Sequence, residues 1–333
     1  MRVLFWGDVS QNNGPANINK GLVKCGSAFF VFVKAKGKYR RMLCALWNVM
    51  GSDAVVVSGV GRQQCIVAAA ANALGKKSLY LMHGCNEQEY KINEVAPDRR
   101  GLAYEAFLMK KAHIILTVSR RYRHWFCTQY PQYAHKTDYI YNGVDRELFA
   151  KPCICQKESG AIAVAGGTSL RKNNIVVARA VERLEGRARL RVYGGEGGMY
   201  PEDFHHTEWV GTVENQQFLS ELSRSEIFVL NSRQESFSIA TLEALACGCS
   251  LLVSECAGVS DLLALEETDI IHDPMDEEEL YRKMAYLLEH PNHQRLYAAF
   301  RVEEWSFEKM ASRLEEKCRV LLDKKTIEKE QRR

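Results

Sequence analysis

The chain has 333 residues, of which 46% are hydrophobic and 26% are charged. This composition excludes a disordered or fibrous protein, and the length predicts two domains of roughly 100–200 residues each. The net charge of +4 conceals an asymmetry, because residues 1–150 hold 21 Lys and Arg against 10 Asp and Glu, whereas residues 151–333 hold 24 against 31. The basic half could meet a phosphorylated acceptor or an anionic membrane, or it could be an ordinary solvated surface.

Eleven cysteines are scattered along the chain. Their odd number, and a start (MRVLFWGDVS) that lacks the features of a secretory signal, predict reduced thiols in a cytoplasmic protein. The pairs Cys153-x-Cys155 and Cys247-x-Cys249 are spaced more closely than the ligands of a structural zinc site. No segment reaches the ~18–20 apolar residues of a transmembrane helix, so any contact with the inner membrane face would be peripheral.

In chain order, short apolar segments that are typical of buried strands alternate with amphipathic helical segments. In the first half we expect strands at residues 2–6, 28–33, 53–59, 78–84, 113–119 and 137–141, and helices at residues 16–26, 39–51, 62–75, 102–112 and 120–130. This alternation predicts a parallel sheet that helices cover on both faces.

The next segment, NGVDRELFAKPCICQKESG (residues 142–160), is polar and aperiodic, and it predicts a linker. The alternation then restarts. We expect strands at residues 161–167, 189–195, 207–211, 227–231, 250–254 and 269–273, and helices at residues 173–186, 215–225, 239–248, 259–265, 276–290 and 306–333. Asp276 begins an acidic first turn, as the helix dipole favours. The predicted fold class is therefore α/β, with two Rossmann-like doubly wound domains at residues 1–150 and 158–305 that face a cleft.

Ligands of doubly wound sheets bind at the carboxyl ends of the strands. After the first strand, Gly14 and Pro15 leave amides open in front of a helix, which suits an anion, although an ordinary turn would have the same sequence. His83 ends a buried strand, where it could donate a hydrogen bond, act as an acid or base, or be a structural histidine.

A second candidate loop opens the second domain. Gly166 and Gly167 allow close backbone approach, and Arg171 and Lys172 follow them. This combination suits a diphosphate, although two ordinary surface cations would look the same. The later stretch VYGGEGG resembles a dinucleotide fingerprint only weakly, because no helix follows it.

Two carboxylates accompany the helix expected at residues 239–248. Glu235 precedes the helix, Glu243 lies within it, and Ser238 is its expected N-cap. A carboxylate is seldom buried without a partner. The pair could compensate the helix dipole and face solvent, or it could accept hydrogen bonds from the hydroxyls of a sugar or a ribose.

Several motifs together resemble one family. The stretch ESFSIATLEALACG resembles the E-x(7)-E signature of retaining GT-B glycosyltransferases of the family-four type. YNGVDRELF is similar to the segment that joins their two domains, and KAHIILTVS, EWVGTV and CAGVSDLL resemble further family segments in the same order. The resemblance spans most of the chain. It implies two Rossmann-like domains and a last helix, at about residues 306–325, that packs back on the first domain near Trp305 and Phe307.

The resemblance also implies roles for individual residues. Glu243 would bind the ribose, Glu235 the hydroxyls of the transferred sugar, and Lys172 the diphosphate, so that Glu235, Lys172 and His83 would be the catalytic residues. The remaining donor-binding residues would be Gly14, Gly166, Gly167, Arg171, Tyr193, Gly194, Thr212, Val213, Ser238 and Ile239.

Four positions depart from the family pattern. Gly167 stands where the family has an arginine, for which Arg171 would substitute. Asn173 and Ser238 each replace a glycine, and Asp261 replaces a glutamate.

The implied reaction is the transfer, with retention, of a hexose-type sugar from a nucleotide-diphosphate sugar, expected to be UDP-linked, to an acceptor hydroxyl. No Asp-x-Asp motif is present, and we expect neither a metal nor another cofactor. The acceptor would be a glycan, a lipid-linked molecule or a protein, in polysaccharide, glycolipid or glycoprotein assembly, and no nucleic-acid partner is expected. The alternatives are a non-catalytic partner subunit of a glycosyltransferase complex and a sugar-nucleotide epimerase.

Overall fold

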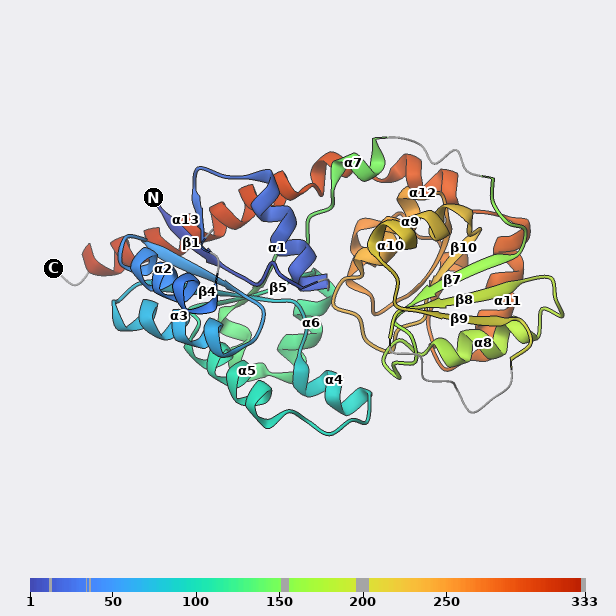
Figure 1. The fold of residues 1–333 in the computed structure, drawn as a ribbon, viewed down its shortest axis with the longest axis horizontal. Helices are drawn as coiled ribbons and strands as arrows, with labels where there is room; N and C mark the ends of the chain where they lie inside the picture. The colour runs from blue at the N-terminus through green and yellow to red at the C-terminus, as the bar shows by residue number, and fades with distance from the viewer. Residues whose placement is uncertain (12–13, 34, 36, 151–155, 196–203, 331–333) are drawn as a thin grey trace. The chain divides into compact units, whose positions relative to one another are not determined.

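The computed structural model describes residues 1–11, 14–33, 35, 37–150, 156–195 and 204–330, with the backbone alone for residues 324–330. The chain divides into two compact units. The first comprises Met1–Tyr90, Val95–Asp145 and Glu303–Arg333, and the second comprises Lys91–Glu94 and Arg146–Val302. Each unit contains one parallel sheet with helices around it (Figure 1).

The sheet of the first unit has six strands in the order β2-β1-β3-β4-β5-β6. They are β1 (Val3–Trp6), β2 (Phe30–Phe32), β3 (Ala54–Ser58), β4 (Lys77–Met82), β5 (Ile114–Thr117) and β6 (Thr137–Tyr139). β1 pairs in parallel with β2 on one side and with β3 on the other, so the strand order reverses between β1 and β3. The strands are almost wholly apolar because both faces of the sheet are covered.

Helices cover both faces of this first sheet. They are α1 (Gly14–Cys25), α2 (Lys38–Met50), α3 (Arg62–Ala73), α5 (Arg99–Lys111), α6 (Arg120–Gln129) and α13 (Phe307–Glu330). The short helix α4 (Asn86–Ile92) follows β4 and buries no side chain. The helices α2, α3, α5 and α6 bury their apolar sides in one core cluster against the sheet. On the other side, α1 packs against α13 (Figure 1).

The last helix, α13, is part of the first unit. The ring of Phe307 lies so close to Gly21 and Gly143 that a side chain at either glycine would collide with it. Trp305 contacts Tyr141 edge to face, with ring centroids 5.1 Å apart. Among the described residues, no helix combines the length and the apolar character that crossing a bilayer requires.

The sheet of the second unit also has six parallel strands, in the order β12-β11-β10-β7-β8-β9. They are β7 (Ala161–Ala165), β8 (Arg189–Tyr193), β9 (Thr207–Gly211), β10 (Ile227–Leu230), β11 (Ser250–Ser254) and β12 (Ile270–Ile271). β7 pairs in parallel with both β8 and β10, so here the strand order reverses between β7 and β10.

The helices of the second unit are α7 (Arg146–Phe149), α8 (Asn174–Glu182), α9 (Asn215–Arg224), α10 (Ile239–Ala246), α11 (Glu277–Glu289) and α12 (His293–Ala299). α8 and α11 pack together over one face of the sheet, and α10 packs with α9 and α12 on the other (Figure 1). The predicted fold of two doubly wound parallel sheets is therefore confirmed.

The structure corrects several details of the sequence prediction. The strand expected at residues 28–33 is only Phe30–Phe32, and the expected linker contains the short helix α7. The helix expected at residues 259–265 is a 3₁₀ turn, Gly258–Leu262, because the amides of Gly258 and Val259 donate to carbonyls of the neighbouring loop instead. Helices α4 and α12 were not predicted, since each is only seven residues long. Asp276 does cap α11, accepting a hydrogen bond from the Glu279 amide at 3.0 Å.

Candidate functional site

The second sheet places two candidate loops side by side. The loop after β7 carries the Gly-Gly and Arg-Lys pairs, and the loop after β10 carries Glu235. Because β7 and β10 are neighbours at the point where the strand order reverses, these loops meet at the usual ligand-binding edge of a doubly wound sheet. Their backbones are joined directly, by a 2.8 Å hydrogen bond from the Arg233 amide to the Arg171 carbonyl.

A charged cluster forms where these loops meet. Glu235 Oε2 accepts hydrogen bonds from Lys172 Nζ and, at 3.2 Å, from Arg171 Nη1. The Arg171 guanidinium also donates to the Gln234 carbonyl at 3.1 Å. One carboxylate thus lies between two cations, and the cluster keeps one formal positive charge.

The protonation of Glu235 follows from these contacts. Glu235 is only 7% exposed, and burial by itself would raise the pKa of its carboxyl group. The Lys172 and Arg171 charges, together with a hydrogen bond from the Phe237 amide, outweigh burial and lower the pKa to about 2. Glu235 is therefore ionised at neutral pH, where a carboxylate is a strong acceptor of hydroxyl hydrogen bonds.

The two glycines after β7 serve the packing of this cluster. Both have positive φ, +106° at Gly166 and +57° at Gly167, which L-residues rarely adopt. A side chain at Gly166 would collide with the stem of Lys172, and one at Gly167 would collide with the backbone of Gly194. Their amides both donate to the Tyr193 carbonyl, at 2.7 and 3.0 Å. In this structure these amides are engaged with the protein rather than open to a ligand.

The loops after β8 and β9 lie beside the glycines. The Gly194 amide donates to the Gly211 carbonyl at 2.7 Å, and Thr212 Oγ1 donates to the Gly195 carbonyl at 3.1 Å. The Tyr193 side chain is buried and bonds Glu221 at 3.3 Å, so only its backbone contacts the glycine loop. The neighbouring Val213 follows directly in the loop between β9 and α9.

The start of α10 differs from the expected capping. Ser238 occupies the N-cap position, but its hydroxyl lies 2.9 Å from Thr241 Oγ1 and makes no capping bond to a backbone amide. The predicted N-cap position is therefore confirmed, but the capping hydrogen bond that usually goes with it is absent. The cause is the backbone, since Ser238 has φ +84° and ψ +92°, outside the extended conformation that a capping serine needs. Ile239 is the first residue of the helix.

Glu243 lies on α10 and is only partly buried. Its Oε1 accepts a 3.0 Å hydrogen bond from Asn215 Nδ2, at the start of α9. Burial raises the pKa of this carboxyl group, and the Asn215 bond partly offsets the rise. The pKa values of the two carboxyl groups are thus shifted in opposite directions. Two cations stabilise the ionised form of Glu235, whereas Glu243 has only the neutral amide of Asn215 as a partner.

Three polar side chains near Glu235 escaped the sequence analysis. Asn231, Ser232 and Gln234 are all buried in the loop after β10. Among the described residues, Asn231 Oδ1, Ser232 Oγ and Gln234 Nε2 have no protein hydrogen-bond partner. Buried polar atoms usually have partners, so these three mark a place where a polar ligand or water belongs. The composition NSRQES, with a polar residue at every position, was the available signal.

In the first unit, His83 ends a chain of hydrogen bonds. Ser58 Oγ donates to Asn19 Oδ1 at 2.7 Å, and Asn19 Nδ2 donates to the Asp8 carbonyl at 2.8 Å. His83 Nε2 lies 2.8 Å from Ser58 Oγ, whose single proton is already used, so Nε2 carries the ring proton and Nδ1 the lone pair. Burial lowers the pKa of His83 to about 4, which keeps the ring neutral at pH 7.

A buried carboxylate fixes the loop that follows His83. Glu105, on α5, accepts hydrogen bonds from the amides of Asn86 and Glu87, at 2.8 and 3.2 Å, where α4 begins. Burial raises the pKa of Glu105 to about 6, although these two amides oppose the rise. The sequence did not reveal this function, because Glu105 stands in an ordinary amphipathic helix.

Gly14, the other candidate of the first unit, is the first residue of α1. Its φ is not in the left-handed region, and a Cβ there would meet no described atom within 4 Å. The fold of the described residues therefore does not require a glycine at this position.

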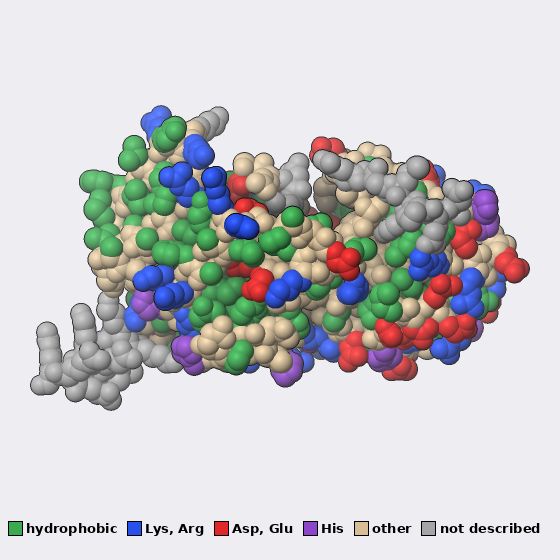
Figure 2. Space-filling model, turned by 90° about the horizontal axis from the view of Figure 1, so that it is seen from below, with side chains coloured by type: hydrophobic (Ala, Val, Ile, Leu, Met, Phe, Trp, Pro, Cys, Tyr) green, Lys and Arg blue, Asp and Glu red, His purple; other side chains and the backbone are tan. Residues whose placement is uncertain are grey.

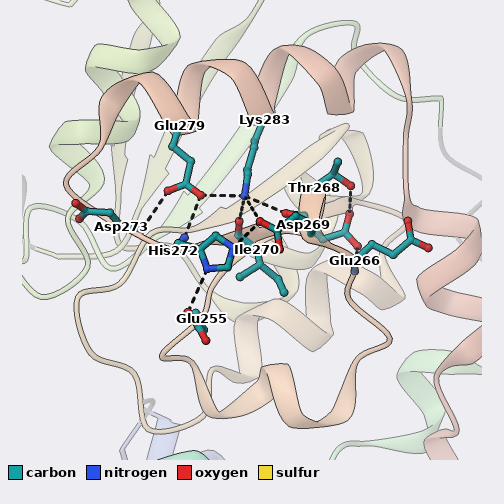
Figure 3. A network of polar contacts seen from close by, with 10 residues as sticks. Glu255, Glu266, Thr268, Asp269, Ile270, His272, Asp273, Glu279 and Lys283 are labelled. Carbon is teal, nitrogen blue, oxygen red and sulfur yellow. Dashed lines mark hydrogen bonds and ion pairs between the residues drawn. The ribbon is translucent and has the colours of Figure 1, made fainter.

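A second polar network lies at the other side of the second sheet (Figure 3). Glu279, on α11, accepts the amides of His272 and Asp273 at 3.1 and 3.0 Å, and also bonds Lys283 at 2.9 Å. The His272 ring lies between Glu255 and Glu267, at 3.2 and 2.7 Å, and these carboxylates raise its pKa. The side chains of this network bond mainly to each other and to the backbone, and they connect β12 to α11. We therefore interpret the network as one that stabilises the second unit.

Part of the second unit matches a known sequence family. Residues 160–290 match a sequence family described as glycosyl transferases group 1. That segment contains all the site residues of the second unit. A search of curated protein sequences found no significant match.

Several solved structures share the fold. HepE from Anabaena, in complex with UDP and glucose, has a TM-score of 0.67 at 13% identity, covering 95% of this chain and 99% of HepE. Sucrose-phosphate synthase from Thermosynechococcus elongatus has a TM-score of 0.68 at 15% identity, covering 97% and 100%. The catalytic domain of starch synthase IV from Arabidopsis thaliana, bound to ADP and acarbose, has a TM-score of 0.67 at 12% identity, covering 96% and 99%. The chain therefore has the GT-B class of fold, with two Rossmann-like units.

Proposed function

We propose that this protein is a retaining glycosyltransferase of the GT-B type, which moves a hexose-type sugar from a nucleotide-diphosphate sugar to an acceptor hydroxyl. The observation that carries the proposal is the cluster of Glu235, Lys172 and Arg171 at the edge where β7 and β10 meet. It lies within the segment that matches the glycosyl transferase family. The charged cluster and the family match both support a glycosyltransferase of group 1.

The charge of the cluster supports binding of a diphosphate. Two cations face one carboxylate, so positive charge remains for the phosphates of the donor. Lys172 and Arg171 come from consecutive positions and are oriented before any ligand binds, which lowers the cost of organising them. As the sugar–phosphate bond breaks, negative charge grows on the leaving phosphate, and these cations stabilise it.

The carboxylates support recognition of hydroxyls. Ionised Glu235 would accept hydrogen bonds from the transferred sugar, and Gln234 Nε2 beside it could donate to a further oxygen. Glu243 would accept from the ribose, where its Asn215 bond orients the carboxylate. The amides at Ser238 and Ile239, at the start of α10, would add dipole stabilisation for a phosphate.

In the proposed reaction, no protein atom forms a covalent bond with the sugar. The acceptor hydroxyl would attack on the face from which the phosphate departs, and the departing oxygen would take the acceptor proton. The protein orients the groups and neutralises charge. Neutral His83 would accept a sugar hydroxyl at Nδ1, and Gly14 would allow the donor to approach the start of α1. In this proposal the cations do the work of a metal, and no cofactor is required.

Two of the structural neighbours support the donor class, since their structures hold UDP with glucose and ADP with acarbose. We propose a UDP-linked donor for this chain. The acceptor belongs to polysaccharide, glycolipid or glycoprotein glycan assembly.

The test is a panel of nucleotide sugars that is screened by thermal shift, because a ligand that binds the folded state raises the melting temperature. One donor should stabilise the wild-type protein, and Lys172→Met should lose that shift. A matched control is Arg187→Ala, which removes an exposed cation paired to Glu289 at 2.8 Å on the same unit.

Two outcomes would overturn the proposal. If no nucleotide sugar binds, the chain is better explained as a non-catalytic partner subunit. If the bound donor is converted to another sugar nucleotide without any acceptor, the protein is an epimerase.

A further inference from the structure

Helix α2 exposes an unusual apolar stripe. Tyr39 is 85% exposed, Leu43 68%, Trp47 74% and Met50 51%. Their spacing of four, four and three residues places all four on one side of a helix. We call this set the α2 face. Large apolar side chains that are exposed singly are common, but a continuous stripe usually marks an interaction surface.

The opposite side of α2 is anchored in the core of the first unit. Ala45 and Val49 are fully buried there. Arg41 lies over the Trp6 ring at 4.7 Å and donates to the Gly7 carbonyl at 2.6 Å. The helix therefore cannot rotate to hide the α2 face without breaking these contacts.

The neighbouring helix extends the apolar surface. α3 packs beside α2 (Figure 1). It exposes Ile66, and Leu74 is exposed at its C-cap. Five of the twelve large apolar side chains that are exposed among the described residues thus lie in these two helices, and a sixth, Leu74, caps the end of α3. On the face drawn in Figure 2, hydrophobic side chains are prominent over the first unit, with Lys and Arg among them.

The charge of this region has one sign. Lys38 and Arg40 lie on α2, and both are exposed. Neither α2 nor α3 contains an Asp or Glu residue. A surface with this charge attracts an anionic partner and has few carboxylates to repel one.

We propose that the α2 face docks on an anionic lipid bilayer, with Trp47 and Tyr39 at the level of the headgroups. Trp and Tyr favour that interface because each has an apolar ring and a polar atom, and adjacent Lys and Arg attract anionic headgroups. The anchored helix presents Leu43, Trp47 and Met50 together, as an interfacial helix requires. The inference concerns a different surface from the proposed sugar-nucleotide site and does not depend on it.

The test is sedimentation of the full-length protein with vesicles of phosphatidylcholine that contain about 30 mol % phosphatidylglycerol, and with vesicles of phosphatidylcholine alone. We expect binding to the anionic vesicles, weakened at high salt because ions screen the headgroup charge. The double variant Leu43→Glu, Trp47→Glu should bind at least about tenfold more weakly, because it places carboxylates at the interface. Arg40→Glu should have a smaller effect.

A matched control is the double variant Met275→Glu, Tyr286→Glu. These side chains are also exposed, at 58% and 43%, but lie on the second unit. It should bind like wild type, and melting curves should show that all the variants are folded. Equal binding of the α2 variant, or equally tight binding to neutral vesicles, would overturn the inference. A concentration-dependent dimer that the α2 variant abolishes would overturn it too, since a second copy of the chain would then cover the face.

Discussion

The two units contain the same topological feature with opposite chemistry. Each sheet reverses its strand order at one point, between β1 and β3 in the first unit and between β7 and β10 in the second. At the first point, Asn19 and Ser58 form a chain of neutral hydrogen bonds to His83. At the second, Glu235 and Lys172 form a charged cluster.

This difference shows which parts of a site come from the fold and which from the loops. The sheet supplies an edge where two loops meet, and it does so twice in this chain. The side chains of those loops then decide whether that edge is neutral or charged, and therefore which part of a ligand it can bind. In the proposed reaction, the charged edge takes the diphosphate and the neutral edge takes uncharged hydroxyls. The following predictions test that division, from the largest effect to the smallest.

The largest expected effect is on turnover. Lys172→Met removes a cation that faces the developing charge on the leaving phosphate, and it should lower kcat by about 10²–10³-fold. The exposed Arg187→Ala variant should retain wild-type kcat. Steady-state kinetics with the donor found by thermal shift would measure both. If Lys172→Met keeps wild-type turnover, the charged edge does not serve the reaction.

The acid stability of the second unit should depend on Glu235. Its pKa in the folded protein is about 2, against 4.5 for an ordinary glutamate, so its ionised form stabilises the fold above pH 4.5. This contribution, of the order of 3 kcal/mol, is lost as the pH falls from 4.5 towards 2. Glu235→Gln should be less stable at neutral pH and should lack that part of the pH dependence. Denaturant unfolding between pH 2 and pH 7 measures it, and equal slopes for the two proteins would refute the assignment.

Two glycines, one from each unit, should respond differently to the same change. Gly166→Ala puts a Cβ against the stem of Lys172 at a positive φ, and should cost about 1–3 kcal/mol of unfolding free energy. Gly14→Ala meets no described atom, so its stability should change by less than about 0.5 kcal/mol. Activity is the second measurement. Loss of donor binding in the stable Gly14→Ala variant would support its role at the ligand, whereas unchanged binding would remove Gly14 from the site.

At position 238, at the start of α10, we expect a glycine variant to be more stable than an alanine variant, the reverse of the usual order in helices. The φ of +84° at Ser238 strains any residue that has a Cβ, while the serine hydroxyl bond to Thr241 is lost in both variants. Ser238→Gly should therefore be about 1 kcal/mol more stable than Ser238→Ala. Urea unfolding of the two variants makes the comparison, and a more stable alanine variant would show that the backbone there is not strained.

The smallest expected effect belongs to the neutral edge. Burial lowers the pKa of His83 to about 4 from 6.5, so the unfolded chain gains a proton before the folded chain does as the pH falls. The stabilising effect of a neutral His83 is thus present above pH 6.5 and is lost between pH 6.5 and pH 4. Because the His83 residue as a whole is of intermediate exposure, water weakens the cost of charging the ring, and the loss should be below about 1 kcal/mol. The stability difference between wild type and His83→Gln across that range measures it. A difference that is constant with pH would show that His83 titrates normally.

Much of the fold could be predicted from the sequence, because its signals are local. Apolar runs such as AVVVS and SLLVS mark fully buried strands, and their alternation with amphipathic helices leaves only a parallel, doubly wound arrangement. The Asp276 cap of α11 was equally local. Helix α4 was missed because it is only seven residues long and because its first amide, that of Asn86, donates to Glu105, which lies 19 residues further along the chain.

The candidate site could be predicted only in part. The sequence indicated that Glu235, Arg171 and Lys172 belong to loops at strand ends, and the sheet order brings those loops together. It could not show that Arg171 and Lys172 share one carboxylate, or that the amides of Gly166 and Gly167 are engaged by Tyr193, since these contacts depend on loop conformation. Asn173 and Ser238, which replace glycines of the family pattern, both have positive φ. Asparagine tolerates that conformation, whereas serine rarely does.

The most direct test of the central claim is a calorimetric titration of the stabilising nucleotide sugar into wild type, Lys172→Met and Arg187→Ala. The claim is that the charged edge of the second sheet binds the sugar diphosphate. It predicts that Lys172→Met binds at least about tenfold more weakly than wild type, because a charge-assisted contact is lost. It also predicts that Arg187→Ala binds with wild-type affinity. Equal affinity of Lys172→Met and wild type would contradict the claim.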